Sequence, residues 1–380
     1  MTDRHDVAFT PDNRTSLGRG LALLVAAAVT LGIAGCEGKP APAKAPEAAA
    51  PSAQPADAGP DTATPEAAQP TATETPAAPT AAKTDDRVYR IGYSQCTVTE
   101  PWRVEVNRRL KLHAEKNYAG VVELTMLDAN DSTETQVAQL KTFIEQEMDA
   151  IIVSPKEAAG LTDVVREATE AGIPVVVIDR DVLYDGYPCY VGGDNKLIGQ
   201  AAGMVAVQML GGPGQAKGVI YELCGGLAST PGQNRRDGFH EIVDKEPGLK
   251  VIGGLDCDWK LNIAQDTFKA ALRANDVIDL VYAHNDPMAH GAYQAAKDAG
   301  RAEEMKFIGI DALPNEGVAW VRAGELTATL LYETPGDLGL DMAVKILRGE
   351  EVPRRITLPT RVYTKENADR GGDPVEVEGP

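Results

Sequence analysis

Small polar side chains close the apolar runs of this 380-residue sequence, and such groups bind polar solutes through hydrogen bonds. In an open parallel sheet the carboxyl ends of the strands meet at one edge, which is where such folds bind ligands. A single Asp or Ser at a strand end usually caps the following helix. Six such positions, divided between two halves of the chain, indicate a binding site: Ser94, Asp128, Ser154, the pair Asp179 and Arg180, the pair Asn285 and Asp286, and Asp311.

The sequence carries none of the short motifs that mark phosphate, metal or serine-nucleophile sites. The first apolar run continues into SQCTVTEPWR, which has no glycine, so no G-x-G-x-x-G or Walker loop follows it. Among the five histidines, His284 and His290 are six apart, a spacing that suits packing or capping better than a shared metal ion. No G-x-S-x-G is present. We therefore expect no catalytic residue, no metal and no cofactor, although a cleft could bring Glu100, Asp311 and Glu333 together as glycosidase carboxylates.

Short apolar runs alternate with amphipathic segments from residue 87 onward, as in sheets that are covered by helices on both faces. Helices are expected over 103–117 and 135–149, and Thr133 with Gln136 has the spacing of a capping box before the second one. Two successive β/α series predict two doubly wound parallel-sheet domains. The expected strands are 88–94, 122–128, 150–155 and 174–179 in the first series, and 218–224, 249–256, 279–286, 306–311 and 326–332 in the second.

The first 86 residues are predicted to be a signal peptide followed by a tether. Arg14 and Arg19 precede the apolar run 21–33, which is too short to span a bilayer and is followed by Ala34-Gly35-Cys36. Residues 1–36 therefore resemble a lipoprotein signal peptide with Cys36 as the lipidated residue. Residues 37–86 contain ten Pro and seventeen Ala and no large apolar residue, a composition typical of a disordered, extended tether. We expect an extracytoplasmic protein, anchored by lipid to the cell envelope.

The charge balance excludes several classes of partner. The formal net charge is −19, and no cluster of Lys and Arg is larger than a pair. A strongly acidic chain repels nucleic-acid phosphates and anionic lipid headgroups. We therefore expect no nucleic-acid partner, no membrane contact apart from Cys36, and a monomer.

Four sequence segments together resemble the periplasmic sugar-binding proteins of ABC importers, in particular the ribose and galactofuranose types. They are IGYSQ…PWR, IPVVVIDR (173–180), VYAHNDPMAHGA (281–292) and GIDALP (309–314), within a similarity that extends over 87–365. The resemblance implies the type I periplasmic binding protein fold, two Rossmann-like lobes joined by three hinge strands, with crossings near 190–194, 332–336 and 358–362. The lobes would then be residues 87–191 with 335–357 and residues 192–334 with 358–380.

The same resemblance implies which residues contact the sugar. Trp102 would be an aromatic platform for a sugar ring, Arg103 and the Asp179–Arg180 pair would bind hydroxyl groups, and Asn285 and Asp311 would do so from the second lobe. Ribose binders have Asn, Arg and Gln where this chain has Glu100, Gln233 and Glu333, or Tyr332 if the alignment shifts by one. Arg235 resembles a structural arginine. The full expected ligand set is Glu100, Trp102, Arg103, Ser154, Asp179, Arg180, Gln233, Asn285, Asp311 and Glu333.

The resemblance thus implies a receptor that binds a neutral hexose, furanose or pentose, closes its lobes around it and delivers it to an ABC transporter permease, without catalysis. Two alternatives stay open at this point. One is a sensory sugar or cyclitol receptor on the same fold, and the other is a secreted glycosidase that uses Glu100 and Asp311.

Four cysteines remain after Cys36, and an oxidising cell envelope permits disulfides between them. Cys224 and Cys257 end neighbouring strands of the second lobe and are the favoured pair. Cys96 with Cys189 is a weaker alternative. Four cysteines allow three connectivities, among which the sequence does not decide.

Overall fold

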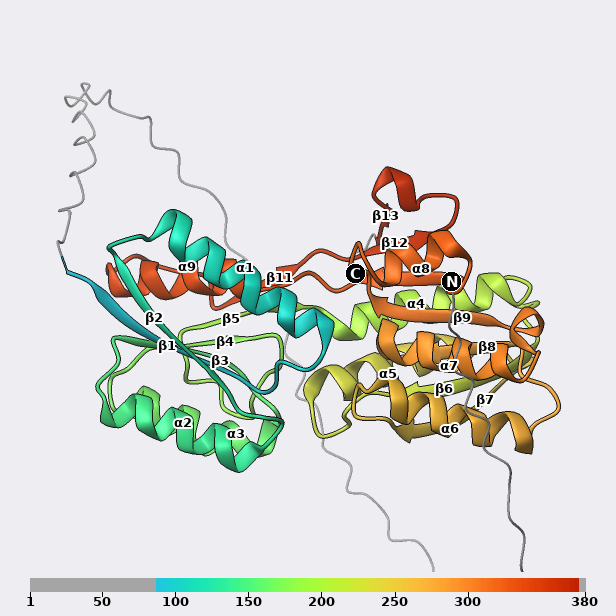
Figure 1. Cartoon of the computed structure of the whole chain (residues 1–380), viewed down its shortest axis with the longest axis horizontal. Coiled ribbons are helices and arrows are strands. Elements are labelled where there is room, and N and C mark those ends of the chain that lie inside the picture. The colour runs from blue at the N-terminus through green and yellow to red at the C-terminus, as the bar shows by residue number, and fades with distance from the viewer. Residues whose placement is uncertain (1–86, 376–380) are drawn as a thin grey trace, which may run out of the picture. The chain divides into compact units, whose positions relative to one another are not determined.

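The computed structural model describes residues 87–375 (Figure 1). The predicted signal peptide with Cys36, the predicted tether and residues 376–380 lie outside this part of the chain. Within 87–375, none of the helices combines the length and the apolar character that a membrane span requires.

The first sheet has six strands, all parallel, in the order β11-β5-β4-β3-β1-β2. Its central strands are buried on both faces, which explains their near-continuous apolar sequence. The bounds are β1 Tyr89–Gln95, β2 Val122–Asp128, β3 Ala150–Ser154, β4 Val175–Ile178, β5 Cys189–Gly193 and β11 Arg355–Leu358.

The second sheet has seven strands in the order β13-β12-β10-β9-β8-β6-β7. The strands from β10 to β7 are parallel, and β12 and β13 are added antiparallel at one edge. The bounds are β6 Gly218–Cys224, β7 Leu249–Asp256, β8 Leu280–Ala283, β9 Lys306–Asp311, β10 Ala328–Leu331, β12 Arg361–Thr364 and β13 Asp373–Pro374. The two predicted parallel sheets are confirmed.

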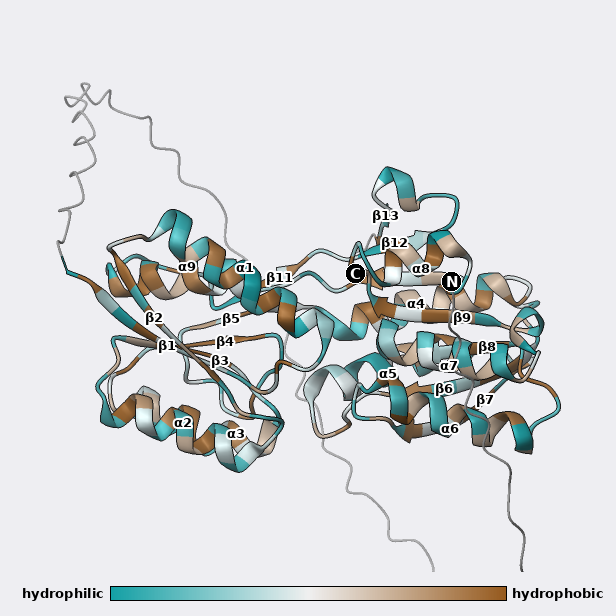
Figure 2. Ribbon diagram, viewed as in Figure 1, coloured by the Kyte–Doolittle hydropathy of each residue, from teal (hydrophilic) through white to brown (hydrophobic). Residues whose placement is uncertain are grey.

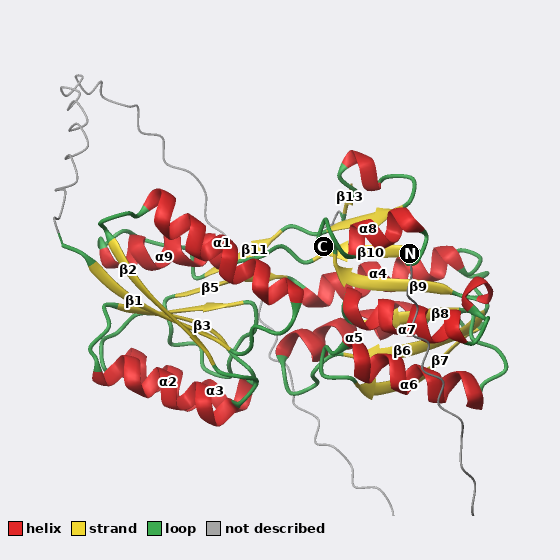
Figure 3. Ribbon diagram, viewed as in Figure 1, coloured by secondary structure: helices red, strands yellow, loops and turns green. Residues whose placement is uncertain are grey.

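Helices cover both faces of each sheet (Figure 3), and their apolar sides face the strands (Figure 2). The first sheet packs between α1 and α9 on one face and α2 and α3 on the other, and the second between α4 and α5 on one face and α6, α7 and α8 on the other. The bounds are α1 Pro101–Asn117, α2 Thr133–Glu145, α3 Ala158–Glu170, α4 Asn195–Met209, α5 Thr230–Val243, α6 Leu261–Ala274, α7 Asp286–Asp298, α8 Gly317–Ala323 and α9 Gly336–Leu347.

The chain passes between the sheets three times: from β5 to β6, from β10 back through α9 to β11, and from β11 to β12. The first sheet therefore contains a strand from near the C-terminal end of the described chain. The sheet memberships are structural facts, whereas the lobe boundaries and the hinge role of the crossings stay predictions.

The predicted capping box before α2 is wrong. The helix is capped one residue earlier, by Ser132, whose hydroxyl accepts a hydrogen bond from the Thr135 amide at 3.1 Å. Gln136 is instead fully buried, and its Nε2 donates to the carbonyl of Ser154 at 2.9 Å. Gln136 therefore binds the end of a neighbouring strand and does not take part in the cap.

The predicted Cys224–Cys257 disulfide is also wrong, because Cys96, Cys189, Cys224 and Cys257 are all free, buried thiols. Cys224 lies opposite Asp256 in the β6–β7 register, so Cys257, one residue further on, has its side chain on the other face of the sheet. Burial raises the pKa of both thiols, that of Cys257 to about 11. The two cysteines are neighbours along the backbone ladder but not through their side chains.

Candidate functional site

A pocket lies between the two sheets, at the carboxyl ends of their strands. Its unfilled space, counted together with the open solvent at its mouth, is about 320 Å³. The first sheet contributes residues that follow β1 and β4, and the second contributes residues that follow or end β6, β7, β8, β9 and β10. This is the edge at which doubly wound sheets bind ligands. The lining residues are Glu100, Trp102, Arg103, Asp179, Arg180, Pro231, Arg235, Trp259, Asn285, Asp311 and Tyr332.

Arg103 and Asp179 form the buried polar centre on the side of the first sheet. The Arg103 guanidinium donates to Asp179 Oδ2 at 2.9 Å, to Glu100 Oε2 at 2.6 Å and to Ser154 Oγ at 3.1 Å. Burial alone would raise the pKa of Asp179, but Arg103 and Arg180 outweigh it and hold that pKa below its ordinary value. Asp179 is therefore a carboxylate that accepts hydrogen bonds at neutral pH.

Aromatic rings and guanidinium groups alternate across the pocket. Trp102 stacks on Tyr332 with ring centroids 4.9 Å apart, and Arg235 lies over Tyr332 at 4.4 Å. The guanidinium groups of Arg235 and Arg180 lie over the ring of Trp259, at 5.4 Å and 5.5 Å from its centroid. Guanidinium groups held against rings in this way gain cation–π attraction and fixed orientation.

Two buried donors on the pocket lining have no hydrogen-bond partner among the described residues, namely Arg180 Nε and Trp259 Nε1. A buried donor without an acceptor costs free energy, so such atoms mark places where a ligand or water belongs. Arg180 uses another nitrogen to donate to the Lys156 carbonyl at 2.8 Å, which fixes the side chain in place. The pocket therefore offers positioned donors to an oxygen-rich solute.

Asp311 supplies a carboxyl group of different character on the side of the second sheet. Burial raises its pKa well above the ordinary value, Arg235 lowers it, and the neighbouring acids Asp286, Glu316 and Glu100 raise it further. Burial likewise raises the pKa of Asp286 to about 7, although Asp286 accepts from Thr329 Oγ1 at 2.6 Å and from the Ala312 amide at 2.8 Å. Asp311 makes no hydrogen bond to a described side chain and remains available to a ligand.

Seven of the ten predicted ligand residues line the pocket, and Ser154, Gln233 and Glu333 do not. Ser154 lies underneath and donates to Asp179 Oδ2 at 2.8 Å, so it supports the pocket from behind. Gln233 is exposed and donates to the Leu227 carbonyl at 2.8 Å. Glu333 pairs with Arg109 at 2.7 Å. Direct contact of these three residues with a ligand is not supported by their positions.

The lining also contains four residues outside the predicted set: Pro231, Arg235, Trp259 and Tyr332. Arg235 was interpreted as a structural brace, and Tyr332 appeared only as the alternative to Glu333. Pro231 and Arg235 are four apart on α5 and share the face that meets the pocket, whereas Gln233 is two residues from each and faces away. Helical phase within the segment TPGQNRRDGF could have separated Arg235 from Gln233.

Asn285 lines the pocket, but its amide is already engaged by the protein. Its Oδ1 accepts from the Met288 amide at 3.0 Å as the N-cap of α7, and its Nδ2 donates to the Trp259 carbonyl at 3.0 Å. Asn285 thus has both roles that are expected of a polar residue at a strand end: it caps a helix and also borders the pocket.

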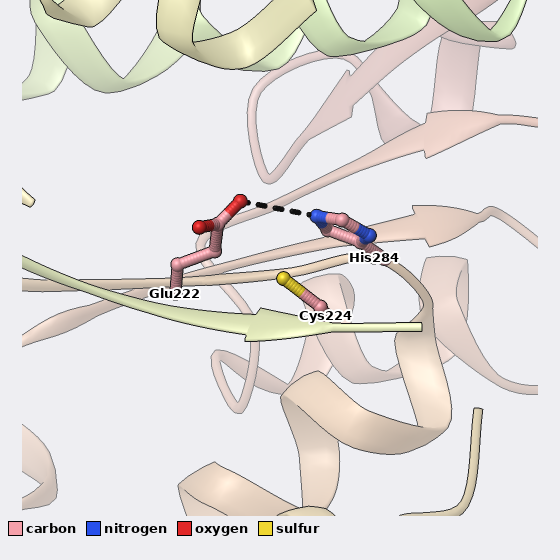
Figure 4. Close-up of side chains that lie close together, drawn as sticks. All are labelled: Glu222, Cys224 and His284. Atoms are coloured by element: carbon pink, nitrogen blue, oxygen red, sulfur yellow. Dashed lines mark hydrogen bonds and ion pairs between the residues drawn. The ribbon is translucent and has the colours of Figure 1, made fainter. Parts of the chain in front are cut away.

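A mixed cluster of Glu222, Cys224 and His284 lies buried in the second sheet, on β6 and directly after β8 (Figure 4). One ligand-type atom from each residue lies within 4.8 Å of the others, a proximity that the sequence spacing did not indicate. Two imidazoles bind the Glu222 carboxylate, His284 Nε2 at 3.2 Å and His240 Nε2 at 3.3 Å. Burial raises the pKa of Glu222, but these two contacts outweigh it and lower the pKa to about 2.

The cluster is connected to the pocket residue Arg235 through the backbone carbonyl of His284. The carbonyl of His284 accepts a hydrogen bond from Arg235 Nη1 at 2.5 Å, and Asn195 Oδ1 accepts from Arg235 Nε at 2.8 Å. Because the Glu222 carboxylate is already satisfied by two imidazoles, its role is explained by the support it gives to His284 and, through it, to Arg235.

Two parallel sheets, three crossings and a polar pocket at the strand ends together define a two-lobed solute-binding protein. The chain belongs to the periplasmic binding protein family, whose domain matches residues 91–351. The family and the type I fold that the sequence motifs indicated are therefore confirmed.

Curated relatives and solved structures are similar over most of the described chain. The ribose import binding protein of Bacillus subtilis is 28% identical over 281 residues, which are 73% of this chain and 88% of that protein. The fructose-binding periplasmic domain of a hybrid two-component system is 38% identical, with a TM-score of 0.70 over 74% of this chain and 92% of that one. A Mycobacterium smegmatis protein solved with β-D-fucofuranose is 30% identical, with a TM-score of 0.70 over 74% and 93%.

Proposed function

We propose that this protein is an extracytoplasmic receptor that binds one monosaccharide in the pocket and delivers it to an ABC importer. The observation that carries the proposal is the pocket lining. It contains Arg180 and Trp259, each with a buried nitrogen that has no hydrogen-bond acceptor among the described residues, together with the carboxyl group of Asp311. Sugars present hydroxyl groups that donate and accept, together with C–H faces that pack on aromatic rings. The relatives named for ribose, fructose and β-D-fucofuranose support a furanose, pentose or hexose as the ligand class.

The proposed mechanism is a shift between an open and a closed arrangement of the lobes. A sugar bound to Arg103, Asp179 and Arg180 on the first lobe would gain further contacts with Arg235 and Asp311 on the second only when the lobes approach. A ligand that makes more contacts in one state stabilises that state. The permease would then recognise the closed, loaded receptor, and the sugar would leave chemically unchanged.

The N-terminal sequence supports a location at the outer face of the cytoplasmic membrane or in the cell envelope. We infer that the signal peptide is removed by cleavage directly before Cys36, that Cys36 carries the lipid and that residues 37–86 hold a monomeric receptor away from the membrane. The periplasmic binding protein family is extracytoplasmic by name, which agrees with this inference.

The proposal is tested by titrating the purified full chain with a panel of monosaccharides and cyclitols in a calorimeter. D-fructose, D-ribose, L-arabinose and D-galactose come first, and myo-inositol represents the cyclitols. We expect saturable one-site binding by at least one of them, with a lower radius of gyration in small-angle scattering at saturation. No heat from any compound of the panel would contradict the proposal.

A sensory receptor is the second candidate, because the 38% identical structure is the periplasmic domain of a two-component system. Both functions use the same pocket and the same closure, so binding experiments do not separate them. Uptake of the labelled sugar does: deletion of the gene should abolish uptake if the protein feeds an importer and leave uptake intact if it only signals.

The relatives are binding proteins, which supports a receptor without catalysis. Glu100 and Asp311 nevertheless line one pocket, as the glycosidase alternative requires. Incubation of the chain with labelled disaccharides followed by chromatography distinguishes the two: a receptor returns the disaccharide intact, and cleavage products would favour the glycosidase.

A further inference from the structure

Four charged side chains form a closed ring of ion pairs at the rim of the pocket. Lys156 contacts Asp131, and its Nζ lies 3.3 Å from Asp258 Oδ1. Lys260 Nζ lies 2.8 Å from Asp131 Oδ2 and 2.5 Å from Asp258 Oδ2. Each ammonium group thus touches both carboxylates, and each carboxylate touches both ammonium groups.

The ring joins the two sheets. Asp131 and Lys156 follow β2 and β3 of the first sheet, whereas Asp258 and Lys260 follow β7 of the second. Two of the four contacts therefore lie within one lobe each, and two, Lys156–Asp258 and Lys260–Asp131, cross between the lobes. Beside the ring, the Ala158 amide donates to the Ala228 carbonyl at 3.2 Å, also from the first lobe to the second.

Partial burial of the ring strengthens the attraction between its charges. The side chains are 15–35% exposed, so water is partly excluded from them. Isolated surface pairs contribute little, because each long side chain must be ordered for a single contact. In the ring each ordered side chain makes two contacts. Burial raises the pKa of Asp131, but Lys156 and Lys260 outweigh it and hold that pKa below the ordinary value.

Two members of the ring flank Trp259, which lines the pocket. Asp258 and Trp259 have φ angles of 48° and 64°, a conformation that L-residues adopt rarely and that surrounding contacts must hold in place. The local contacts are the Asp258 amide to Asp256 Oδ1 at 2.8 Å and the Lys260 amide to the Cys257 carbonyl at 2.9 Å. The ring adds two contacts from the opposite lobe to this short loop.

We propose that Asp131, Lys156, Asp258 and Lys260 are positioning residues that hold the lobes together and fix Trp259 over the pocket, so that they set the affinity for the ligand without touching it. The effect on ligand affinity rests on the proposed function, whereas the attraction between the lobes does not. The ring would make the closed state more populated before any ligand arrives, and a ligand then binds more tightly.

Charge exchange separates the contacts between the lobes from those within each lobe. The double variant Asp131→Lys with Lys156→Asp keeps net charge and the ion pair inside the first lobe, but it places like charges opposite each other at both crossings. Adding Asp258→Lys with Lys260→Asp exchanges the second lobe as well and restores attraction at both crossings. A purely local role within one lobe would not be rescued by exchange in the other.

The first measurement needs no sugar. Acrylamide quenching of fluorescence reports the exposure of the three tryptophans. Trp102 and Trp259 line the pocket and are 5% and 6% exposed in the structure, whereas Trp320 on α8 does not line the pocket and gives a constant background. Small-angle scattering reports compactness. We expect the double variant to be quenched more strongly and to be less compact than the parent, and the fourfold variant to return to the parent values. This outcome tests the ring even if no sugar binds.

The second measurement is the Kd for the sugar that the calorimetric panel identifies, with D-fructose as the first probe. We expect the double variant to bind roughly tenfold more weakly, the fourfold variant to recover, and the parent Kd to rise with ionic strength more steeply than that of the double variant. Equal quenching, compactness and Kd in parent and double variant would overturn the proposal, as would a double variant that the fourfold exchange does not rescue.

A neutral pair keeps the test decisive if lysine at the positive-φ positions 131 and 258 prevents folding. Lys156→Gln with Lys260→Gln leaves those aspartates in place and removes all four ion pairs. Lys269→Gln, which breaks an exposed pair with Asp266 on α6, is the matched control. We expect stronger quenching and a weaker Kd from the neutral pair but not from the control, with similar melting temperatures. No difference between the neutral pair and the control would contradict the proposal.

Discussion

Within the pocket, similar side chains have different tasks because their partners differ. Arg103 donates from Nε to Glu100 and from Nη1 to Gln95, Ser154 and Asp179, so it holds these groups of the site together. Arg180 keeps a buried nitrogen without an acceptor among the described residues and is held by a backbone carbonyl. Arg103 therefore holds neighbouring carboxylates in place, whereas Arg180 keeps a donor that can bind an oxygen of the ligand.

Replacement of Arg180 by alanine should therefore weaken sugar binding strongly. A hydrogen bond from a charged donor contributes about 1.5–3 kcal/mol, so the loss of one corresponds to a roughly 10- to 150-fold higher Kd. Isothermal titration measures the change. Arg166→Ala is the matched control, since Arg166 pairs with exposed Asp163 outside the pocket. Equal Kd values for Arg180→Ala and the parent would remove Arg180 from the site.

Asp311 should make the protein less stable as the pH rises. Its folded-state pKa is raised by burial, so its contribution is fully present below the ordinary pKa of an aspartate and is lost as the pH rises towards the folded value. Glu222 has the opposite effect. Its folded-state pKa is lowered to about 2, so the stability that it contributes is lost only as the pH falls towards that value. Urea unfolding at pH 5 and pH 8 should show a smaller loss of unfolding free energy in Asp311→Asn than in the parent. An unchanged or larger loss would contradict this assignment.

The sequence predicted those pocket residues that have a strong local signal. Trp102, Arg103, Asp179 and Arg180 stand directly at strand ends or helix starts within recognisable motifs. Trp259 has no such signal, because it lies in a loop after β7, a strand in which no residue is buried. Its place in the pocket results from contacts with Arg180 and Arg235, which come from other elements.

Among the elements, α4 and α5 approach each other closely because glycines form their contact. A Cβ atom at Gly199 on α4 would lie 2.3 Å from the backbone oxygen of Arg235 on α5, and one at Gly238 on α5 would lie 2.1 Å from the backbone oxygen of Lys196 on α4. Backbone atoms cannot move aside as side-chain ends can. The position of Arg235 in the pocket therefore depends on the absence of a side chain at Gly199.

Gly199→Ala should reduce both stability and binding. Overpacking of this kind costs about 1–3 kcal/mol, and a shift of α5 would displace the Arg235 guanidinium from Tyr332. Chemical denaturation and calorimetry measure the two effects. Met204→Ala, at a half-exposed position on the same helix, is the control and should change neither by much. A Gly199→Ala protein with parental stability would show that the helices separate without cost.

The long, apolar elements were predictable from the sequence, and the pairing of the short ones was not. Strands β2, β6, β7 and β9 lie where the apolar runs placed them. The segments CYVGG of β5 and RITL of β11 are too short and mixed to indicate strands by periodicity, and the sheet recruits them by pairing Tyr190 with Arg355 and Val191 with Ile356. The cysteine prediction failed for a related reason, since it considered which strands are neighbours but not which face each thiol occupies.

At the scale of the whole chain, the folded residues are expected to depend on the N-terminal segment for their location. The family is periplasmic, and in the proposed function one covalent anchor at Cys36 holds the receptor at a membrane.

Replacement of Cys36 by alanine should release the protein from the membrane without altering its pocket. In a Gram-negative host, the parent should incorporate labelled palmitate and sediment with membranes, whereas Cys36→Ala should not incorporate the label. Both should bind sugar with the same Kd, because the residues that line the pocket all lie between Glu100 and Tyr332, far along the chain from Cys36. Palmitate labelling of the variant equal to that of the parent would place the anchor elsewhere.

The return of the chain to the first sheet also has a consequence for biosynthesis. Strand β11, made of Arg355–Leu358, pairs with the edge of β5, which ends 162 residues earlier at Gly193. While the nascent polypeptide is still emerging from the ribosome or the translocon, that edge has no partner. The first sheet is therefore completed only after Leu358 has been synthesised, and until then its open edge is exposed to chaperones and to pairing with other chains.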